Sequence, residues 1–400
     1  MKKNIGIYIS GLGQSFHQEN VLKYAERFKN ELLFIEKGTS YDLRSEIITY
    51  SGKNTSKVVK VVKLGQENEE VVYTFYEFEY HELLTERFKK RNMLLKNSLL
   101  FLLVLKKLPQ LLKRVFIHDN YNRPYLTFYA FFILVLVSLA VLFLIPASID
   151  MVNDFQVAKK ILTFIEGLTG DFPAYLKQTY KWTVPLTTFI LLVIPESKTI
   201  VTSIATEFAC ADQYLNDGMQ SQLISGNLDL LVEYISEHEH ESKIHFHCYS
   251  FGCLIATDYL FPLGTMPSKN AKLLTELLIT IGNPYEFINS YYSSYFKNRN
   301  LVMEQKLKWI NVYSISDALS SNFRKNSTRG EALNGIRDSS LKPINLNYEV
   351  SPDKSQNFFN FITMDGIRMH KLYWDMETNG QSCIRIILDK MVELEIIKNE

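Results

Sequence analysis

Two hydrophobic patterns divide this chain: short apolar runs between polar segments at both ends, and long uncharged stretches in the middle. The short runs alternate apolar and polar positions or are rich in β-branched and aromatic residues, which predicts strands. We expect these strands at 5–10, 46–50, 71–78, 244–248, 277–282 and 309–316. Apolar residues that recur every three or four positions predict helices at 18–33, 221–240, 253–261 and 384–397. Strands and helices therefore interleave at both ends of the chain.

The middle of the chain carries a membrane-type pattern. Residues 125–145 contain no charged side chain. As a helix this stretch is about 30 Å long, which is the thickness of a bilayer core. We expect it to span a membrane, with a long buried soluble helix as the alternative. A second apolar stretch, 183–194, is only about 18 Å long as a helix, and its hydropathy alone fits a span and a buried segment equally well.

The order of the segments favours a second crossing. If strands from both sides of the apolar region join one sheet, they lie on the same side of the membrane, so the chain crosses an even number of times. We therefore expect a transmembrane hairpin with spans at 125–145 and 180–200 and with 146–179 on the far side. Lysines and arginines close before the first span favour a cytoplasmic location for both ends. Ahead of the hairpin, 83–112 predicts a helix with a basic face, which fits either a core helix or one lying on a membrane surface.

Composition narrows the classes of function. The formal net charge is +1, which argues against nucleic-acid binding driven by bulk charge. The four cysteines show no metal-ligand spacing, so we expect them reduced in a cytosolic compartment. The run Glu237-His-Glu-His-Glu241 resembles a metal cluster, but no further ligand lies near it in sequence, which favours a solvated helix end. We expect neither a metal nor a cofactor.

The segment from Cys248 to Gly252, read C-Y-S-F-G, joins a predicted strand directly to a predicted helix. Ser250 stands at the apex of this tight turn, with a small residue two positions before it and two after it. Such a turn holds a serine hydroxyl where a histidine can reach it, and it directs the backbone N–H of Phe251 toward a developing oxyanion. An ordinary buried strand–turn–helix with an incidental serine is the alternative.

Two further residues fit the chemistry of an activated serine. Asp317 directly follows the predicted strand 309–316, and His370 is the sole histidine after Ser250 in the sequence. In this arrangement the histidine takes the serine proton, while the aspartate fixes the histidine tautomer and stabilises the imidazolium. Taken singly, Asp317 fits a turn at a strand end and His370 fits a surface histidine.

With C-Y-S-F-G, I-S-G-L-G at 9–13 and S-I-S-D at 314–317, the chain resembles the α/β-hydrolase superfamily, above all its lipase- and esterase-like serine hydrolases. Cysteine stands where the G-x-S-x-G pattern has its first glycine. The resemblance implies a mostly parallel α/β sheet with helices on both faces and cofactor-independent hydrolysis of an ester, thioester or amide. It also implies Ser250, Asp317 and His370 as the catalytic triad and Leu12 and Gly13 as oxyanion donors beside Phe251. A simple tight turn or a phosphate loop is the alternative for 11–13, although the P-loop pattern is absent.

The resemblance divides the chain into three parts. Residues 1–80 and 205–400 are expected to form the hydrolase domain, and 81–204 the basic helix and the hairpin inserted into it. We therefore expect a membrane-anchored enzyme that cleaves a lipid or long-chain acyl ester, with the bilayer as its partner and no nucleic acid. A catalytically silent scaffold and a membrane-perturbing or channel effector with a ligand-sensing domain remain as alternatives. A monomer and a homo-oligomer are both compatible with the sequence.

Overall fold

The computed structural model describes residues 3–12, 20–84 without 37 and 66–68, 106 and 109, 210–349 without 217, 318 and 325–328, 369–374 and 382–397. Within this part of the chain, eight strands form one sheet in the order β2-β3-β4-β1-β5-β6-β7-β8. The strands are β1 (Lys3–Ile9), β2 (Ser40–Ser51), β3 (Asn54–Leu64), β4 (Glu69–Glu77), β5 (Ser242–Tyr249), β6 (Thr275–Ile281), β7 (Lys308–Tyr313) and β8 (Ile344–Asn347). Strands from both sides of the region 85–209 therefore join one sheet.

The sheet is mostly parallel. From β4 through β1, β5, β6 and β7 to β8 every neighbouring pair is parallel, whereas β2, β3 and β4 form an antiparallel meander at one edge. Because the parallel strands end at the same edge, the loops after β1, β5, β6 and β7 emerge together there. This carboxyl edge carries the candidate site.

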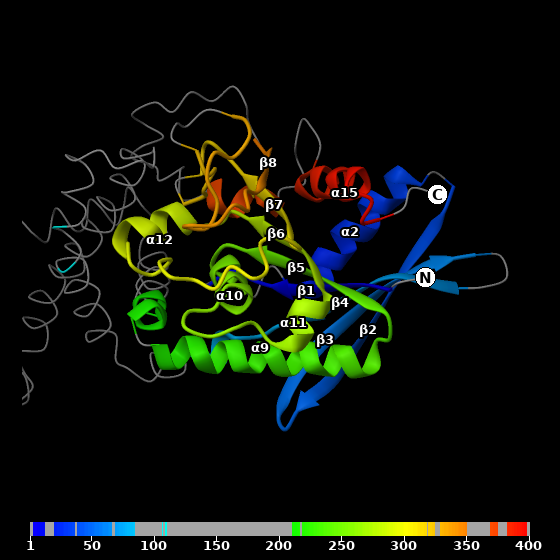
Figure 1. The fold of residues 1–400 in the computed structure, drawn as a ribbon. Coiled ribbons are helices and arrows are strands. Elements are labelled where there is room, and N and C mark those ends of the chain that lie inside the picture. Colours follow the sequence, from blue (N-terminus) through cyan, green and yellow to red (C-terminus); the bar gives the residue numbers. More distant parts are fainter. Residues whose placement is uncertain are drawn as a thin grey trace, which may run out of the picture.

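Helices cover both faces of the sheet (Figure 1). One face is packed by α2 (Val21–Ile35) and α15 (Cys383–Glu393), and the other by α9 (Gly218–His238), α10 (Phe251–Leu260), α11 (Lys269–Leu274) and α12 (Tyr285–Tyr291). Polar caps begin three of these helices: Asn20 accepts a hydrogen bond from Lys23 N, Ser268 accepts one from Ala271 N, and Ser382 accepts one from Arg385 N. The expected mixed α/β fold with a mostly parallel sheet and helices on both faces is confirmed.

Several elements differ from the sequence prediction. Strand β2 is longer than 46–50, and β3, β8, α11 and α12 were not predicted. In β3 the lysines at 57, 60 and 63 recur every third position, which breaks the alternation typical of a strand. The valines between these lysines, at 58, 59, 61 and 62, are all buried, because both faces of this part of the sheet are covered.

The two predicted membrane spans are not part of the chain that the structure describes. The predicted spans 125–145 and 180–200 lie outside the described residues, as does the predicted helix 83–112 apart from Leu83, Leu84, Lys106 and Pro109. Among the helices that the structure describes, none has the length and apolar character needed to cross a bilayer.

Candidate active site

Ser250 occupies a strained turn between β5 and α10. Its backbone has φ 52° and ψ −121°, a conformation that residues with a side chain rarely adopt. The turn is held by hydrogen bonds from Ser250 N to Ile281 O at 2.9 Å and from Cys253 N to Ser250 O at 3.0 Å. The strain is therefore maintained by the neighbouring strand β6 and by the first turn of α10.

Small residues are needed around Ser250 because other parts of the chain pass very close to this turn. A Cβ on Gly252 would lie 2.3 Å from Ile9 O and 2.8 Å from Ser10 O, so the end of β1 leaves room for glycine alone. A Cβ on Gly11 would lie 2.9 Å from the Cβ of Ser250. On the other side of the turn, the Cys248 side chain fits completely buried in the core of the α9 and α10 face. The chain after β1 thus passes directly beside the serine.

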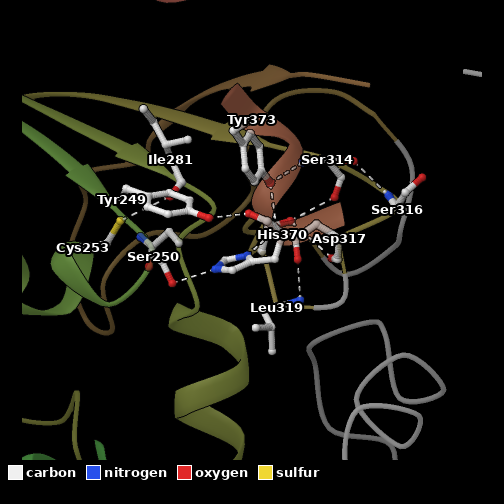
Figure 2. Close-up of polar contacts among 12 residues, drawn as sticks. Tyr249, Ser250, Cys253, Ile281, Ser314, Ser316, Asp317, Leu319, His370 and Tyr373 are labelled. Carbon is white, nitrogen blue, oxygen red and sulfur yellow. Dashed lines mark hydrogen bonds and ion pairs between the residues drawn. The ribbon is translucent and has the colours of Figure 1, made fainter. Parts of the chain in front are cut away.

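His370 connects the serine to a buried carboxylate (Figure 2). It lies in the 3₁₀ helix η1 (Met369–Trp374), and its Nε2 is 2.7 Å from Ser250 Oγ. Its Nδ1 is 2.8 Å from Asp317 Oδ2. Since a carboxylate accepts hydrogen bonds, Nδ1 carries the proton and Nε2 is free to accept one from the serine hydroxyl. The three residues predicted from the sequence are thus brought into one hydrogen-bonded chain from three separate segments.

Asp317 is fully buried and held at both oxygens. Leu319 N donates to Oδ1 at 2.9 Å, and the Tyr373 hydroxyl donates to Oδ2 at 2.9 Å. Burial by itself raises the pKa of this carboxyl, but the electrostatic interaction and hydrogen bond with His370, together with these two hydrogen bonds, outweigh it and hold the pKa below its ordinary value. Asp317 therefore stays ionised and can stabilise a positive charge on His370.

Two tyrosines that were not predicted hold the histidine segment in place. The Tyr249 hydroxyl donates to His370 O at 2.6 Å, and its ring stacks on the imidazole at a centroid distance of 5.6 Å. The Tyr373 hydroxyl accepts a hydrogen bond from Ser314 N at 3.0 Å while donating to Asp317. In the sequence, both tyrosines lie close to a predicted site residue: Tyr249 directly precedes Ser250, and Tyr373 follows His370 by three positions. This proximity is the signal that could have indicated them.

A glycine at the end of β6 gives this segment its space. Gly282 has φ +59°, and a Cβ there would lie 3.0 Å from both the His370 and the Tyr373 rings. Glycine is needed for the backbone conformation and for the close approach. The sequence predicted a strand end at this position but no functional role for the glycine.

The three predicted oxyanion donors are described to different extents. Phe251 is the first residue of α10, where backbone N–H groups have no partner within the helix. Leu12 is partly buried and packs against the same core as Phe251. Gly13 lies outside the described residues.

The acidic and histidine-bearing end of α9 directs its side chains to separate partners. The His238 ring stacks on Tyr234, and Glu239 accepts hydrogen bonds from Tyr76 and Lys3. Over the described residues, no group of three or more His, Cys, Asp or Glu side chains is arranged to hold a metal ion.

Comparison of the chain with protein-family models, with curated proteins and with solved structures finds no match. The geometry of the Ser250 site therefore carries the functional argument.

Proposed function

We propose that this protein is a serine hydrolase of the α/β-hydrolase type that cleaves an ester at Ser250. The observation that carries the proposal is the hydrogen-bonded chain from Ser250 Oγ through His370 to Asp317, with distances of 2.7 and 2.8 Å. A strained serine, a histidine within reach of its hydroxyl and a buried carboxylate behind the histidine are the parts that acyl transfer requires.

The mechanism follows from these contacts. Ser250 Oγ attacks the carbonyl carbon of the ester while its proton moves to His370 Nε2, and Asp317 stabilises the imidazolium that forms. The proton then passes to the departing alcohol as the tetrahedral intermediate collapses to an acyl-serine. Water attacks this acyl group, again giving its proton to His370, and the serine regains that proton as the carboxylic acid leaves. The N–H of Phe251, at the positive end of α10, and those of Leu12 and Gly13 would stabilise the oxyanion.

We further propose that the substrate is a lipid or another long-chain acyl ester that comes from a bilayer. Two described residues that flank the region 85–209 support this choice. Tyr80, before the region, and Tyr214, after it, contact the ring of Phe251 at centroid distances of 6.2 and 5.2 Å. The Tyr80 hydroxyl also donates to Ser10 O at 2.9 Å. The described residues before and after the region of the predicted hairpin therefore both lie beside Phe251, the residue that follows Ser250.

The hairpin itself stays a proposal: spans at 125–145 and 180–200, both ends cytoplasmic and 146–179 across the membrane. An anchor attached at these points would keep Ser250 close to the bilayer surface. Burial of an acyl chain contributes roughly 0.8 kcal/mol per CH₂, so a long chain is recognised by apolar contact alone. Labelling of a cysteine introduced at Asp154 by a membrane-impermeant reagent from the far side tests the orientation.

Covalent labelling tests the nucleophile. A fluorophosphonate probe should label the full chain in membranes: Ser250 Oγ attacks the phosphorus, an O–P bond forms, the P–F bond breaks and fluoride leaves. Ser250→Ala should abolish labelling and ester hydrolysis, since loss of a triad member costs several orders of magnitude in rate. Ser221→Ala is the matched control, at a serine on α9 whose hydroxyl donates a hydrogen bond to Gly218 O. The probe should label this variant as it labels the wild type. Undiminished labelling of Ser250→Ala would exclude this serine as the nucleophile.

A substrate comparison tests the lipid proposal separately. Wild type and Ser250→Ala, each in vesicles, are offered a short soluble ester and a long-chain phospholipid. We expect release of fatty acid from the phospholipid that depends on Ser250. If Ser250-dependent cleavage is seen with the soluble ester alone, the proposal of a serine hydrolase stands and the proposal of a lipid substrate is rejected.

A further inference from the structure

The outer strand of the meander, β2, has an exposed backbone edge. It ends the sheet on the side opposite β8 (Figure 1), and within the described residues no strand pairs with its outer side. Its twelve residues make it the longest strand that the structure describes. Ser45, Glu46 and Ile47, near its middle, are all exposed, and Ile47 is 75% exposed. An edge of this kind presents a row of N–H and C=O groups that can pair with another strand.

The sequence of β2 is complementary to itself. In an antiparallel pair of two β2 strands centred on Ser45, residue 44 of one copy lies opposite residue 46 of the other. Arg44 would then face Glu46 twice, once on each side of the axis. Residues 43 and 47 also face each other, so the exposed Ile47 would pack against the partly buried Leu43. A two-fold arrangement thus satisfies both the charges and the apolar side chains.

Charges already present on the strand favour the same arrangement. Arg44 lies directly opposite Lys60 of β3, which places two positive side chains side by side. Within the chain Arg44 pairs with Glu69, and Lys60 Nζ contacts Glu46 Oε1 at 2.7 Å. Both members of the new pair stay half exposed, with side-chain exposures of 55% for Arg44 and 52% for Glu46. A second Glu46 beside Arg44 would offset the repulsion between Arg44 and Lys60.

We propose that two copies of this chain associate through β2, antiparallel and around a two-fold axis at Ser45, which continues the sheet across both subunits. Strands β3, β4 and β1 separate β2 from β5, which leads to Ser250. The interface therefore leaves both candidate active sites open, and the association does not depend on the proposed hydrolase activity.

A cysteine on the axis tests the register. The four native cysteines are buried, so Ser45→Cys supplies one accessible thiol per chain. Opposite residues of an antiparallel pair have Cα atoms about 4.5–5.5 Å apart, which suits a disulfide. Mild oxidation of the full chain in the cells that express it should give a cross-linked dimer on a non-reducing gel.

Thr49→Cys is the matched control, because Thr49 is exposed on the same strand but opposes residue 41 in the proposed register. Two copies of residue 49 are offset by eight positions, about 27 Å. No cross-link is therefore expected from this variant. Equal cross-linking of the two variants, or none from Ser45→Cys, would overturn the proposal.

Charge reversal tests the contact between the strands in the Ser45→Cys background. Arg44→Glu creates two like-charged contacts, which should lower the cross-linked fraction about tenfold. Adding Glu46→Arg restores opposite charges across the axis and should recover most of the dimer. The register is rejected if both variants lose the cross-linked dimer while their melting temperatures stay close to that of the Ser45→Cys parent. It is also rejected if neither variant loses the dimer. Fluorophosphonate labelling of Ser250 is read in parallel, so a failed hydrolase proposal and a failed dimer proposal give different results.

Discussion

The hydroxyl of Tyr373 donates to Oδ2 of Asp317 at 2.9 Å, the oxygen that also contacts His370 Nδ1. Both side chains are fully buried, and burial raises the pKa of Tyr373 well above its ordinary value, so the hydroxyl keeps its proton and remains a donor. Tyr373 lies in the same 3₁₀ helix as His370, three positions later. One short segment therefore supplies the histidine and a hydrogen bond that orients the carboxylate behind it.

Tyr373→Phe should lower kcat about tenfold while leaving KM nearly unchanged. The substitution removes a hydrogen bond to a charged group, worth about 1.5–3 kcal/mol, and leaves Ser314 N without this acceptor. Asp317 would then orient His370 less well during proton transfer, whereas substrate binding would not lose a contact. Steady-state kinetics on the ester that the wild type cleaves measure the change.

Tyr259→Phe is the matched control for that prediction. The Tyr259 hydroxyl donates to Asp229 Oδ1 at 2.7 Å, a tyrosine–carboxylate contact between α10 and α9. Its loss should lower the free energy of unfolding by a similar amount with kcat unchanged. If both variants lose kcat equally, Tyr373 acts through overall stability and not through the position of Asp317.

The strained backbone of Ser250 predicts an unusual ranking of two inactive variants. Ser250→Ala and Ser250→Gly both lose the hydroxyl and its contact with His370. Glycine adopts φ 52° readily, which relieves about 1–3 kcal/mol of strain, while its greater freedom in the unfolded chain costs about 0.5–1 kcal/mol. Ser250→Gly should therefore unfold at a higher temperature than Ser250→Ala, as measured by thermal melting. The opposite ranking would mean that the turn is not strained.

The sequence predicted the triad because its signals are local or limited in number. The turn around Ser250 is a continuous motif, Asp317 follows a strand directly, and the histidine had one candidate after the serine. Tyr249, Tyr373 and Gly282 act through contacts between segments that are far apart in the chain. Such contacts leave no periodicity in the sequence, so these residues could not be assigned before the structure.

The same limit explains why the burial and the hydrogen-bond partner of two histidines in β5 were not predicted from the sequence. His245 and His247 alternate with apolar residues in the sequence, yet both are completely buried because helices cover both faces of this central strand. The Tyr73 hydroxyl lies 2.6 Å from His245 Nδ1 and 2.8 Å from His247 Nε2. Burial lowers the pKa of His245 to about 3, so it stays neutral near neutral pH. The pattern predicted the strand correctly but could not identify a partner about 170 residues away.

The close approach of β1 to the first turn of α10 gives a steric prediction. Gly252→Ala would bring a methyl group to 2.3 Å from Ile9 O, a backbone atom that cannot move without distorting the central strand. We expect a loss of several kcal/mol in the free energy of unfolding, in the range of severe overpacking. Gly226→Ala, on α9 with nothing within 4 Å of the added carbon, should instead stabilise by about 0.5–1 kcal/mol. Chemical denaturation of both variants measures the contrast, and similar effects at the two sites would refute the steric explanation.

The last prediction concerns pH and a buried carboxyl at the end of β4. Glu77 is 4% exposed, and its Oε1 accepts a hydrogen bond from Val21 N, the first residue of α2, at 3.1 Å. Burial raises the pKa of Glu77 to about 7, with the Val21 N–H acting in the opposite direction. The folded state thus binds this proton more tightly than the unfolded state, whose pKa is near 4.5. The resulting stability is complete below about pH 4.5 and is lost as the pH rises through 7.

Glu77→Gln should remove this pH dependence, since the amide keeps an oxygen acceptor for Val21 N and does not titrate. The pKa difference corresponds to a free energy on the order of 3 kcal/mol, so the variant should be more stable than the wild type at pH 8 and nearly equal to it at pH 4.5. Melting temperatures at these two pH values measure the difference. Glu237→Gln, at an exposed glutamate of α9, is the control, and the gain in stability at pH 8 is expected from Glu77→Gln alone. A stability gain of Glu77→Gln that is the same at both pH values would show that Glu77 does not titrate in this range, because a gain from packing alone does not vary with proton concentration.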